Sequence, residues 1–401
     1  MDMAKPIIRF KGYQDDREQR KLGEIITEYK ETVDSECTLP ILTSSKTEGV
    51  ILQEEHFGRK QQHDITGYNI LPRNYCTYRN RSDGVDFTFN INKCCDKGII
   101  SKFYPVFSGK NSDVFFLSLV LNNSDEVVRE IAYTCTGTGQ KVLSFLDLQK
   151  MKVRVPSYDE QKEIAAYFEN LDYLITLHQR KCDETKKLKK YMLQKMFPQN
   201  GEKVPEIRFS GFTDDWEQRK LSEIALQTYG GGTPKTANEE FWKGNIPWIQ
   251  SSDLLEERLF NVKPRKYISQ EAISKSSTKL VPQNSIAIVT RVGVGKLAFM
   301  PFSYATSQDF LSLSELKIEP EFAVYALYKM MRLVSNEVQG TSIKGITKDE
   351  LLAKEILIPD CEEQKKIGAY LHNLDDLITL HQRELESLQN IKKFMLEKMF
   401  V

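Results

Sequence analysis

The sequence lacks any long apolar segment. Its 401 residues are 40% hydrophobic and 28% charged, and the longest apolar runs are short and interrupted. A membrane-spanning helix needs about 20 consecutive, mostly apolar residues, so none is expected. The acidic, proline-containing N-terminus does not have the pattern of a secretory signal. We therefore expect a cytoplasmic protein.

Residues typical of metal sites are also few. The seven cysteines have no CxxC spacing and are odd in number, which is typical of reduced thiols in a cytosolic protein. Cys94 and Cys95 are adjacent, but no second pair accompanies them. Two of the five histidines, His178 and His381, fall on the apolar helical stripes described below, where we expect them to set helix register. We expect no metal site in this chain.

The sequence has no excess of charge of one sign and no recognisable catalytic motif. It contains 56 Lys plus Arg and 56 Asp plus Glu, which argues against binding nucleic acid through overall charge. The segments 137–141 and 293–296 lack the spacing of a phosphate-binding loop, and no GxGxxG, HExxH or GxSxG motif occurs. We therefore expect a non-catalytic chain that holds no cofactor itself.

What the sequence does contain is a long charged segment that occurs twice. Residues 159–197 are repeated by residues 362–400, and both copies contain LITLHQR, starting at Leu174 and Leu377. The apolar residues of each copy advance in steps of four and three, which predicts a helix with a coiled-coil seam. A helix of this size is roughly 55 Å long and cannot bury its stripe in a small domain alone. We expect the two helices to pack on each other as an antiparallel coiled coil.

A second repeat, here called the opening motif, begins each half. Residues 6–22 and 205–221 are identical at 12 of 17 positions. Each copy has a glycine for a turn and then an Asp-Asp pair, which we expect to cap a short helical turn carrying EQRKL. The acidic cluster superficially suggests a nuclease, but the E-x-K spacing of a metal-dependent nuclease is missing. Structural docking is the favoured interpretation.

Between opening motif and long helix, each half has a body that is more variable. Residues 70–81 and 280–291 each start with a P-x-N turn that leads into a strand-like run. GTGQK at 137–141 aligns with GTSIK at 340–344, and Pro156 aligns with Pro359 just before each helix. We predict a mixed α/β fold with two related bodies and pseudo-two-fold symmetry. The predicted division is 1–22 and 199–221 for the opening motifs, 23–156 and 222–358 for the bodies, and 157–198 and 359–401 for the helices.

The bodies carry a local excess of positive charge, in the regions where the two halves differ. Residues 41–110 contain ten Lys or Arg against seven Asp or Glu, and residues 229–300 contain ten against six. Lys and Arg suit phosphates, while Arg, Asn and Gln can read base edges. Gly230–Gly232 and Gly293–Gly295 allow close approach of a backbone to a ligand. For any single residue, an ordinary loop role remains an equal alternative. The candidate nucleic-acid contacts are Lys46, Arg59, Lys60, Arg73, Tyr78, Arg79 and Arg81 in the first body, and Tyr229, Thr233, Lys235, Trp248, Ser251, Arg291, Lys296 and Gln308 in the second, with Tyr75, Gln250 and Ser252 beside them.

Several segments in this order resemble the specificity subunit of type I restriction-modification systems. They are the opening motif ending DDWEQRKL, the ATSQDF at 305–310, the GTSIK with Ile-Pro before EEQKKI, and the helix containing NLDDLITLHQR. The resemblance covers the whole chain. It implies two target recognition domains, each followed by a long helix.

The resemblance also implies a function and partners. The chain would be a non-catalytic subunit that reads a bipartite, asymmetric DNA sequence, with one domain on each half-site and the helices setting the spacing between them. It would hold two modification subunits that methylate adenine with S-adenosylmethionine, and two restriction subunits that use ATP and Mg²⁺. Two similar bodies suit half-sites about one helical turn, roughly 34 Å, apart or somewhat more. The alternatives are a coiled-coil scaffold that binds protein rather than DNA, and a fused, self-contained methyltransferase or nuclease.

Overall fold

The chain forms two compact units, each built from both halves of the sequence. The computed structural model describes residues 6–60, 64–137, 139–199, 201–339 and 345–400. The first unit contains residues 1–178 and 383–401, and the second contains residues 179–382. The GTSIK segment at 340–344 lies outside the described residues. Both units are mixed α/β, so the predicted class of fold is confirmed.

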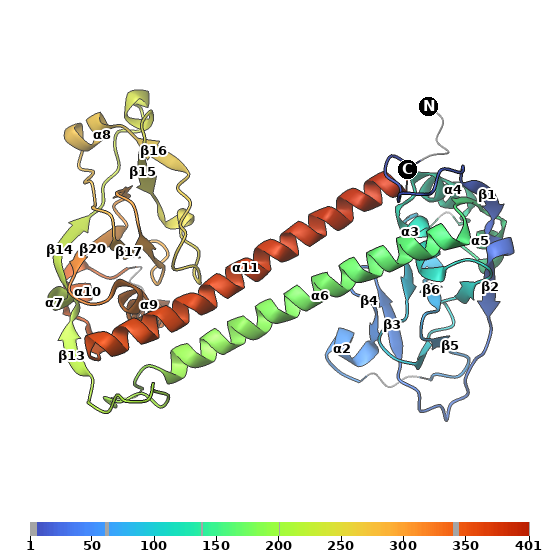
Figure 1. Ribbon diagram of the computed structural model, residues 1–401, viewed down its shortest axis with the longest axis horizontal. Helices are drawn as coiled ribbons and strands as arrows, with labels where there is room; N and C mark the ends of the chain where they lie inside the picture. Colours follow the sequence, from blue (N-terminus) through green and yellow to red (C-terminus); the bar gives the residue numbers. More distant parts are fainter. Residues whose placement is uncertain (1–5, 61–63, 138, 200, 340–344, 401) are drawn as a thin grey trace. The chain divides into compact units, whose positions relative to one another are not determined.

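A four-stranded sheet forms the centre of each unit, with the same strand order in both. In the first unit the order is β2-β10-β6-β8, and in the second it is β14-β20-β17-β18. All neighbouring pairs in these two sheets are antiparallel. The strands are β2 (Ile26–Tyr29), β6 (Cys76–Tyr78), β8 (Phe89–Ile91) and β10 (Val106–Gly109) in the first unit, and β14 (Ala225–Gly230), β17 (Ser285–Val289), β18 (Leu297–Met300) and β20 (Phe310–Leu316) in the second (Figure 1).

The predicted P-x-N turns explain part of this equivalence. Asn74 and Asn284 both have a positive φ, 62° and 59°, which Asn adopts more readily than most residues. Asn74 accordingly turns the chain into β6, and Asn284 turns it into β17. The same local sequence therefore starts the same central strand in both units.

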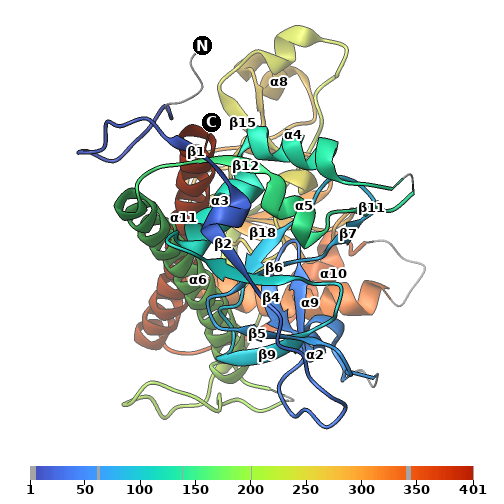
Figure 2. The ribbon, with the colours of Figure 1, turned by 90° about the vertical axis from the view of Figure 1, so that its right-hand side faces the viewer.

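Helices and smaller strand pairs complete each body. In Figure 2, α4 and α5 lie toward one end of the first unit and the β5–β9 pair toward the other. In the second unit, β15 pairs with both β16 and β19. The helices and strands of the first body are α2 (Gln53–Phe57), α3 (Val114–Asn123), α4 (Asp125–Thr134), α5 (Phe145–Lys150), β3 (Leu42–Ser45), β4 (Gly49–Leu52), β5 (Asn69–Pro72), β7 (Arg81–Ser82), β9 (Lys97–Ile100) and β11 (Lys141–Val142). Those of the second are α8 (Gln270–Lys275), α9 (Pro320–Gln339), α10 (Lys348–Ala353), β15 (Ile246–Ile249), β16 (Lys266–Ile268), β19 (Ala305–Thr306) and the short 3-10 turns Glu239–Trp242 and Ser251–Asp253.

The EQRKL segment is a strand in both halves, so the expected helical turn is wrong. Strand β1 (Glu18–Lys21) pairs with β12 (Lys152–Val155), and β13 (Glu217–Lys220) pairs with β21 (Glu355–Ile358). The backbone groups of EQRKL are satisfied by a ladder with a strand that lies far away in the sequence. Only the next four residues of each copy are helical, as α1 (Leu22–Ile25) and α7 (Leu221–Ile224).

The two long helices are present almost as predicted. Helix α6 spans Tyr158–Lys195 and α11 spans Cys361–Met399. Each contributes residues to both units. The predicted apolar stripe is buried at its start in both copies. The most buried members are Ile164 (0%), Phe168 (0%) and Leu171 (6%) in α6, and Ile367 (1%), Leu371 (0%) and Leu374 (6%) in α11.

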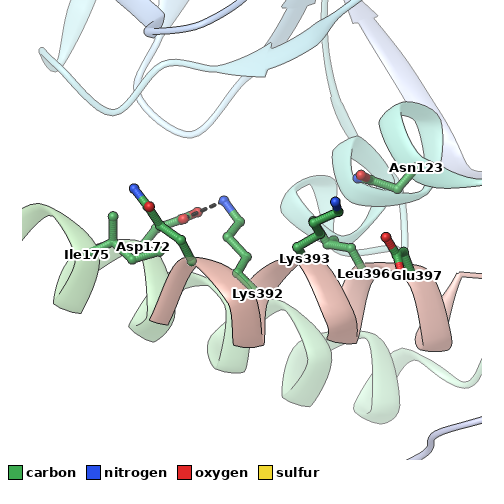
Figure 3. Close-up of a pocket in the computed structure, with 8 residues that line it drawn as sticks. Asn123, Asp172, Ile175, Lys392, Lys393, Leu396 and Glu397 are labelled. Carbon is green, nitrogen blue, oxygen red and sulfur yellow. Dashed lines mark hydrogen bonds and ion pairs between the residues drawn. The ribbon is translucent and has the colours of Figure 1, made fainter. Parts of the chain in front are cut away.

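Within each unit, the start of one long helix packs beside the end of the other. In the first unit Asp172 of α6 accepts an ion-pair hydrogen bond from Lys392 of α11, as Figure 3 shows. In the second unit the Nζ atom of Lys189 lies 2.6 Å from Oδ1 of Asp375. These two contacts occupy corresponding positions of the repeat, with the helices exchanged.

The opening motif ties these helix ends together. Arg9 donates to both carboxylate oxygens of Glu160 at 2.8 and 2.6 Å, and Arg208 donates to both of Glu363 at 2.8 Å. Both carboxylates are fully buried. The backbone N–H groups of Ile8 and Ile207 donate to the last turns of α11 and α6, at Lys398 and Lys195. The motif therefore docks structurally, as the sequence predicted.

Candidate nucleic-acid interface

In the second unit, four loops meet at one end of the strands of the central sheet. The register pairs Gly230 with Leu311 and Val289 with Phe310, so β14 and β17 end where β20 begins. Ile249 at the end of β15 pairs with Thr306 of β19, next to the same place. We call the resulting surface the four-loop face. It consists of residues 230–235, 250–253, 291–296 and 306–309.

Hydrogen bonds join these four loops to one another. Thr233 Oγ1 donates to Gln308 Oε1 at 2.6 Å, and Ser251 Oγ donates to the carbonyl of Val292 at 2.6 Å. The N–H of Ser307 donates to the carbonyl of Ile249 at 2.9 Å. Six predicted contacts therefore belong to one surface: Thr233, Lys235, Ser251, Arg291, Lys296 and Gln308. Arg291, Lys235 and Gln308 are exposed, and Thr233, Ser251 and Lys296 are half-buried.

A buried carboxylate fixes the 250–253 loop. The side chain of Asp253 is fully buried, accepts from the N–H of Gln250 at 2.9 Å and lies 2.5 Å from Nε of Arg265. The side chain of Arg265 is 59% exposed. Sequence reasoning missed Arg265 and its neighbour Lys266, whose Nζ lies 5.6 Å from the ring centre of Trp248. The basic and aromatic run at 263–267 was the signal that could have revealed them.

Trp248 itself is not a surface contact, which corrects the prediction. Its side chain is 4% exposed, and its Nε1 donates to the carbonyl of Gly232 at 3.0 Å. The ring packs with Trp242 at 5.0 Å between centroids. An indole buried in this way stabilises the loop from beneath and cannot contact a duplex.

The predicted role of the glycines also changes. A Cβ on Gly231 would lie 1.8 Å from the carbonyl oxygen of Ser307, and one on Gly232 would lie 2.7 Å from Ser277. These two glycines therefore serve close packing inside the protein. Gly293 and Gly295 have φ values of 91° and 104°, so they serve the turn that carries Arg291 and Lys296.

The first unit has an exposed basic group at the corresponding sheet edge. Arg79 and Arg81 follow β6, as Arg291 follows β17. The guanidinium of Arg81 lies 4.7 Å from the ring centre of Phe103. Lys46, in the turn between β3 and β4, pairs with Asp86, and this contact together with the Ser82 hydroxyl lowers the pKa of that carboxyl group. Lys102, which also lies within 5.9 Å of the Phe103 ring centre, was missed by the sequence analysis.

Two of the first unit's predicted contacts do not belong to this group. Tyr78 is fully buried, and its hydroxyl donates to the carbonyl of Leu143 at 3.1 Å. Burial raises the pKa of Tyr78 far above its ordinary value. Arg73 is exposed but precedes β6, at the opposite end of the strand from Arg79, and pairs with Asp96 at 2.8 Å. A direct role of Tyr78 is therefore wrong, and Arg73 is separated from the others.

The remaining candidates lie in intermediate positions. Arg59 and Lys60 are exposed just after α2, and Lys60 lies 3.8 Å from Glu54 of that helix. Tyr229 is half-buried near the end of β14 and packs against the apolar cluster of Val289 and Phe310. Tyr75, half-buried before β6, packs edge-on against Tyr29 at 5.1 Å.

The structure contains a further hollow of about 470 Å³ between α6, α11 and the end of α3 in the first unit. Figure 3 shows Asp172 and Lys392 in it, with Asn123 of α3 nearby. Lys392 and Lys393 are balanced there by Asp172 and Glu397, so the lining does not favour an anion. Among the described residues, no group of three or more His, Cys, Asp or Glu side chains is arranged to hold a metal ion. No helix in the described part of the chain combines the length and apolarity needed to cross a membrane.

Two related sheets, each with exposed basic side chains where its central strands end, define a protein built from two similar modules. A family model for the type I restriction modification DNA specificity domain matches the sequence twice, over residues 16–187 and 213–390. The chain belongs to this family.

Individual relatives agree with this assignment. The chain is 29% identical over 194 residues to the MjaIX specificity subunit of Methanocaldococcus jannaschii, covering 47% of this chain and 44% of that one. It is 33% identical over 172 residues to the EcoR124I/EcoR124II specificity subunit of Escherichia coli, covering 40% and 41%. The matches thus span about half or less of these two relatives. The fold is similar to that of the type I restriction-modification S subunit from M. genitalium, with a TM-score of 0.63, 13% identity and 99% of both chains covered.

Proposed function

We propose that the chain is the DNA sequence-specificity subunit of a type I restriction-modification complex. One observation carries this proposal. Two units with the same strand order each present basic, exposed loops at the same sheet edge, and those loops differ in sequence between the units. Phosphate contacts position such a surface, and side chains unique to each unit would read different bases. The target would then be bipartite and asymmetric.

The long helices would set the spacing between half-sites and dock the modification subunits. In support, α6 and α11 are continuous in their residue bounds, and each unit holds a corresponding ion pair between them. We infer an antiparallel coiled coil that acts as a spacer. The recognition domains in this scheme are residues 23–156 and 222–358.

The proposed partners are double-stranded DNA, two modification subunits and two restriction subunits, acting in the cytoplasm. S-adenosylmethionine, and ATP with Mg²⁺, would be used by those partners and not by this chain. A coiled-coil scaffold for protein partners is disfavoured because the family model that matches both halves is a DNA specificity domain.

The proposal is tested by removing one arginine from each unit. Full-length chain is assembled with its modification subunits, and methylated adenines are mapped by sequencing. Arg291→Ala should relax or abolish recognition in one half of the target and Arg79→Ala in the other, each by about 1–3 kcal/mol if the guanidinium reads a base. An arginine that contacts only phosphate should instead weaken binding evenly and reduce the salt slope by about 1.

Arg73→Ala is the matched control. It removes an exposed arginine from the first unit at the opposite end of β6, so it should leave both halves of the target unchanged. A wild-type complex without any preferred DNA sequence would overturn the proposed function. So would Arg79→Ala and Arg291→Ala variants that affect the same half of the target.

A further inference from the structure

The contact between Thr233 and Gln308 fixes which side of an exposed amide points outward. The Thr233 hydroxyl donates to Oε1 of Gln308 at 2.6 Å, so the carbonyl oxygen of the amide faces the protein. Thr233 is half-buried and Gln308 is exposed. The Nε2 group of Gln308, with its two N–H donors, is left on the side of the amide away from this contact.

Thr233 is itself held firmly by its neighbours. The N–H of Gly232 donates to the carbonyl of Thr306 at 2.8 Å, and the carbonyl of Gly232 accepts from the buried indole of Trp248 at 3.0 Å. Gly231 packs so closely on Ser307 that any Cβ would collide with its carbonyl oxygen. The loop that carries Thr233, just after β14, and the loop that carries Gln308 are therefore held together before any ligand binds.

We propose that Gln308 reads a guanine in the half-site of the second unit, and that Thr233 is the residue that positions it. This inference rests on the proposed function and deepens it. In the major groove an unconstrained glutamine favours adenine, because the amide accepts from N6 and donates to N7. Here the Thr233 hydroxyl holds the amide oxygen toward the protein, so the outward side of the amide presents the two N–H donors of Nε2. The donors that remain match a base edge with two acceptors, and guanine presents N7 and O6 there.

The preorganised loops support this choice over a phosphate contact. A phosphate accepts from mobile donors in many geometries, whereas base readout needs an amide held in one orientation. Lys296 and Arg291 on the neighbouring turn carry positive charge on the four-loop face. Gln308 carries no charge, so its contribution would be selectivity between bases, which comes from the fixed orientation of its amide.

The test uses the full-length chain in complex with its modification subunits and a DNA library with a randomised second half-site. The wild-type complex should prefer guanine at one position. Gln308→Ala should reduce that preference by about tenfold. Thr233→Val, which keeps the branched shape but removes the hydroxyl, should let the amide rotate and accept adenine at the same position. Thr233→Ser keeps the hydroxyl and should retain the guanine preference.

Each outcome separates this inference from the function on which it rests. A Thr233→Val variant with wild-type preferences at every position overturns the inference, as does a Gln308→Ala variant that weakens all sequences equally, since the latter would mark a phosphate contact. Both results leave the specificity function standing if the wild-type complex selects a sequence. Absence of any selected sequence in the wild-type complex overturns the function itself.

Discussion

The two units share a plan but differ in how the body grips the long helices. Asp113 donates its backbone N–H to Gln161 of α6, and Glu319 donates its backbone N–H to Gln364 at the corresponding position of α11, which aligns α3 with α9. Six residues further on, the first unit has Leu119 and the second has Tyr325. Tyr325 donates its hydroxyl to Asp375 at 2.6 Å, beside Lys189.

Two more aligned positions differ in the same way. Lys329 donates to the carbonyls of Phe197 and Pro198 just after α6, while Asn123 at the aligned position donates within its own helix, to Leu119. In the opening motif the second unit buries Trp216, whereas the first buries Arg17. The Nε and Nη2 atoms of Arg17 have no hydrogen-bond partner among the described residues.

These differences show that the same fold and the same ion pairs can be surrounded by different side chains in the two units. In the second unit, a tyrosine, a lysine and a tryptophan contact the long helices or the residues just after them. The first unit leaves a hollow near Asp172 and Lys392 and buries a second arginine near Glu160. Variants that exchange these residues should show how much each arrangement contributes.

The largest effect is expected from the buried carboxylates. Glu363→Ala removes the partner of Arg208, and breaking a buried pair on one side costs about 3–5 kcal/mol. Glu160→Ala should cost more, because it removes the ion-pair partner of Arg9 and also the negative charge near the buried Arg17. Urea unfolding of the full chain measures both.

The double variant Glu160→Ala with Arg17→Trp sharpens this comparison. It gives the first unit the tryptophan of the second, so its cost should fall to that of Glu363→Ala. Burial lowers the pKa of Arg17 to about 10, and the negative charge of Glu160 opposes that shift. The extra cost of Glu160→Ala is therefore attributed to the buried positive charge of Arg17. Equal costs for the two single variants would contradict the role assigned to Arg17.

A smaller effect is expected from the tyrosine contact. Tyr325→Phe removes one hydrogen bond to a carboxylate and should lower the free energy of unfolding by about 1.5 kcal/mol. The reciprocal change Leu119→Tyr places a hydroxyl toward Asp172 and should raise it by less than about 1 kcal/mol. Urea unfolding again provides the measurement. If both substitutions destabilise the chain equally, the hydroxyl contact is not what distinguishes the units.

The smallest effect is a pH dependence from Lys329. Burial lowers its pKa from 10.5 to about 8, so between these values the unfolded chain holds a proton that the folded chain has released. Stability from this group therefore increases as pH rises from 8 to 10.5. The free energy of unfolding of wild type minus that of Lys329→Met should therefore become more positive over that range. The change should be less than about 1 kcal/mol because the amine is half-exposed.

Asn123→Met provides the control for this pH dependence. The aligned position in the first unit has no titratable group, so the difference between wild type and Asn123→Met should stay flat from pH 8 to 10.5. Urea unfolding at several pH values supplies both curves. A flat Lys329→Met curve would show that the lysine keeps its ordinary pKa.

Much of the scaffold could be predicted from local sequence. The long helices were expected at 159–197 and 362–400 and lie at Tyr158–Lys195 and Cys361–Met399. Apolar residues spaced alternately four and three apart lie on one face of a helix, so this pattern can be read from a single segment. The EQRKL strands were missed because their partners lie more than a hundred residues away, as in the pairing of Glu18 with Val155.

The candidate site was predicted only in part. The turn carrying Arg291 and the loop carrying Gln308 were recognised, since polar and glycine-rich loops follow strands. The burial of Tyr78 and Trp248 was not, because an aromatic residue beside basic residues has the same local sequence in a core as on a surface. Arg73 and Arg79 are separated because they lie at opposite ends of β6. The alternation of apolar and polar residues in the sequence does not show where that strand lies in the sheet.

The sequence by itself determined that the chain consists of two related halves, each ending in a long helix with one apolar stripe. The repeat is visible when the two halves are compared residue by residue, and helical periodicity is a property of neighbouring residues. Only the tertiary structure decided which side chains lie at the basic sheet edges and which stabilise them from within. That choice depends on strand order and register, which join Thr233 to Gln308 and bury Trp248 through contacts between distant parts of the chain.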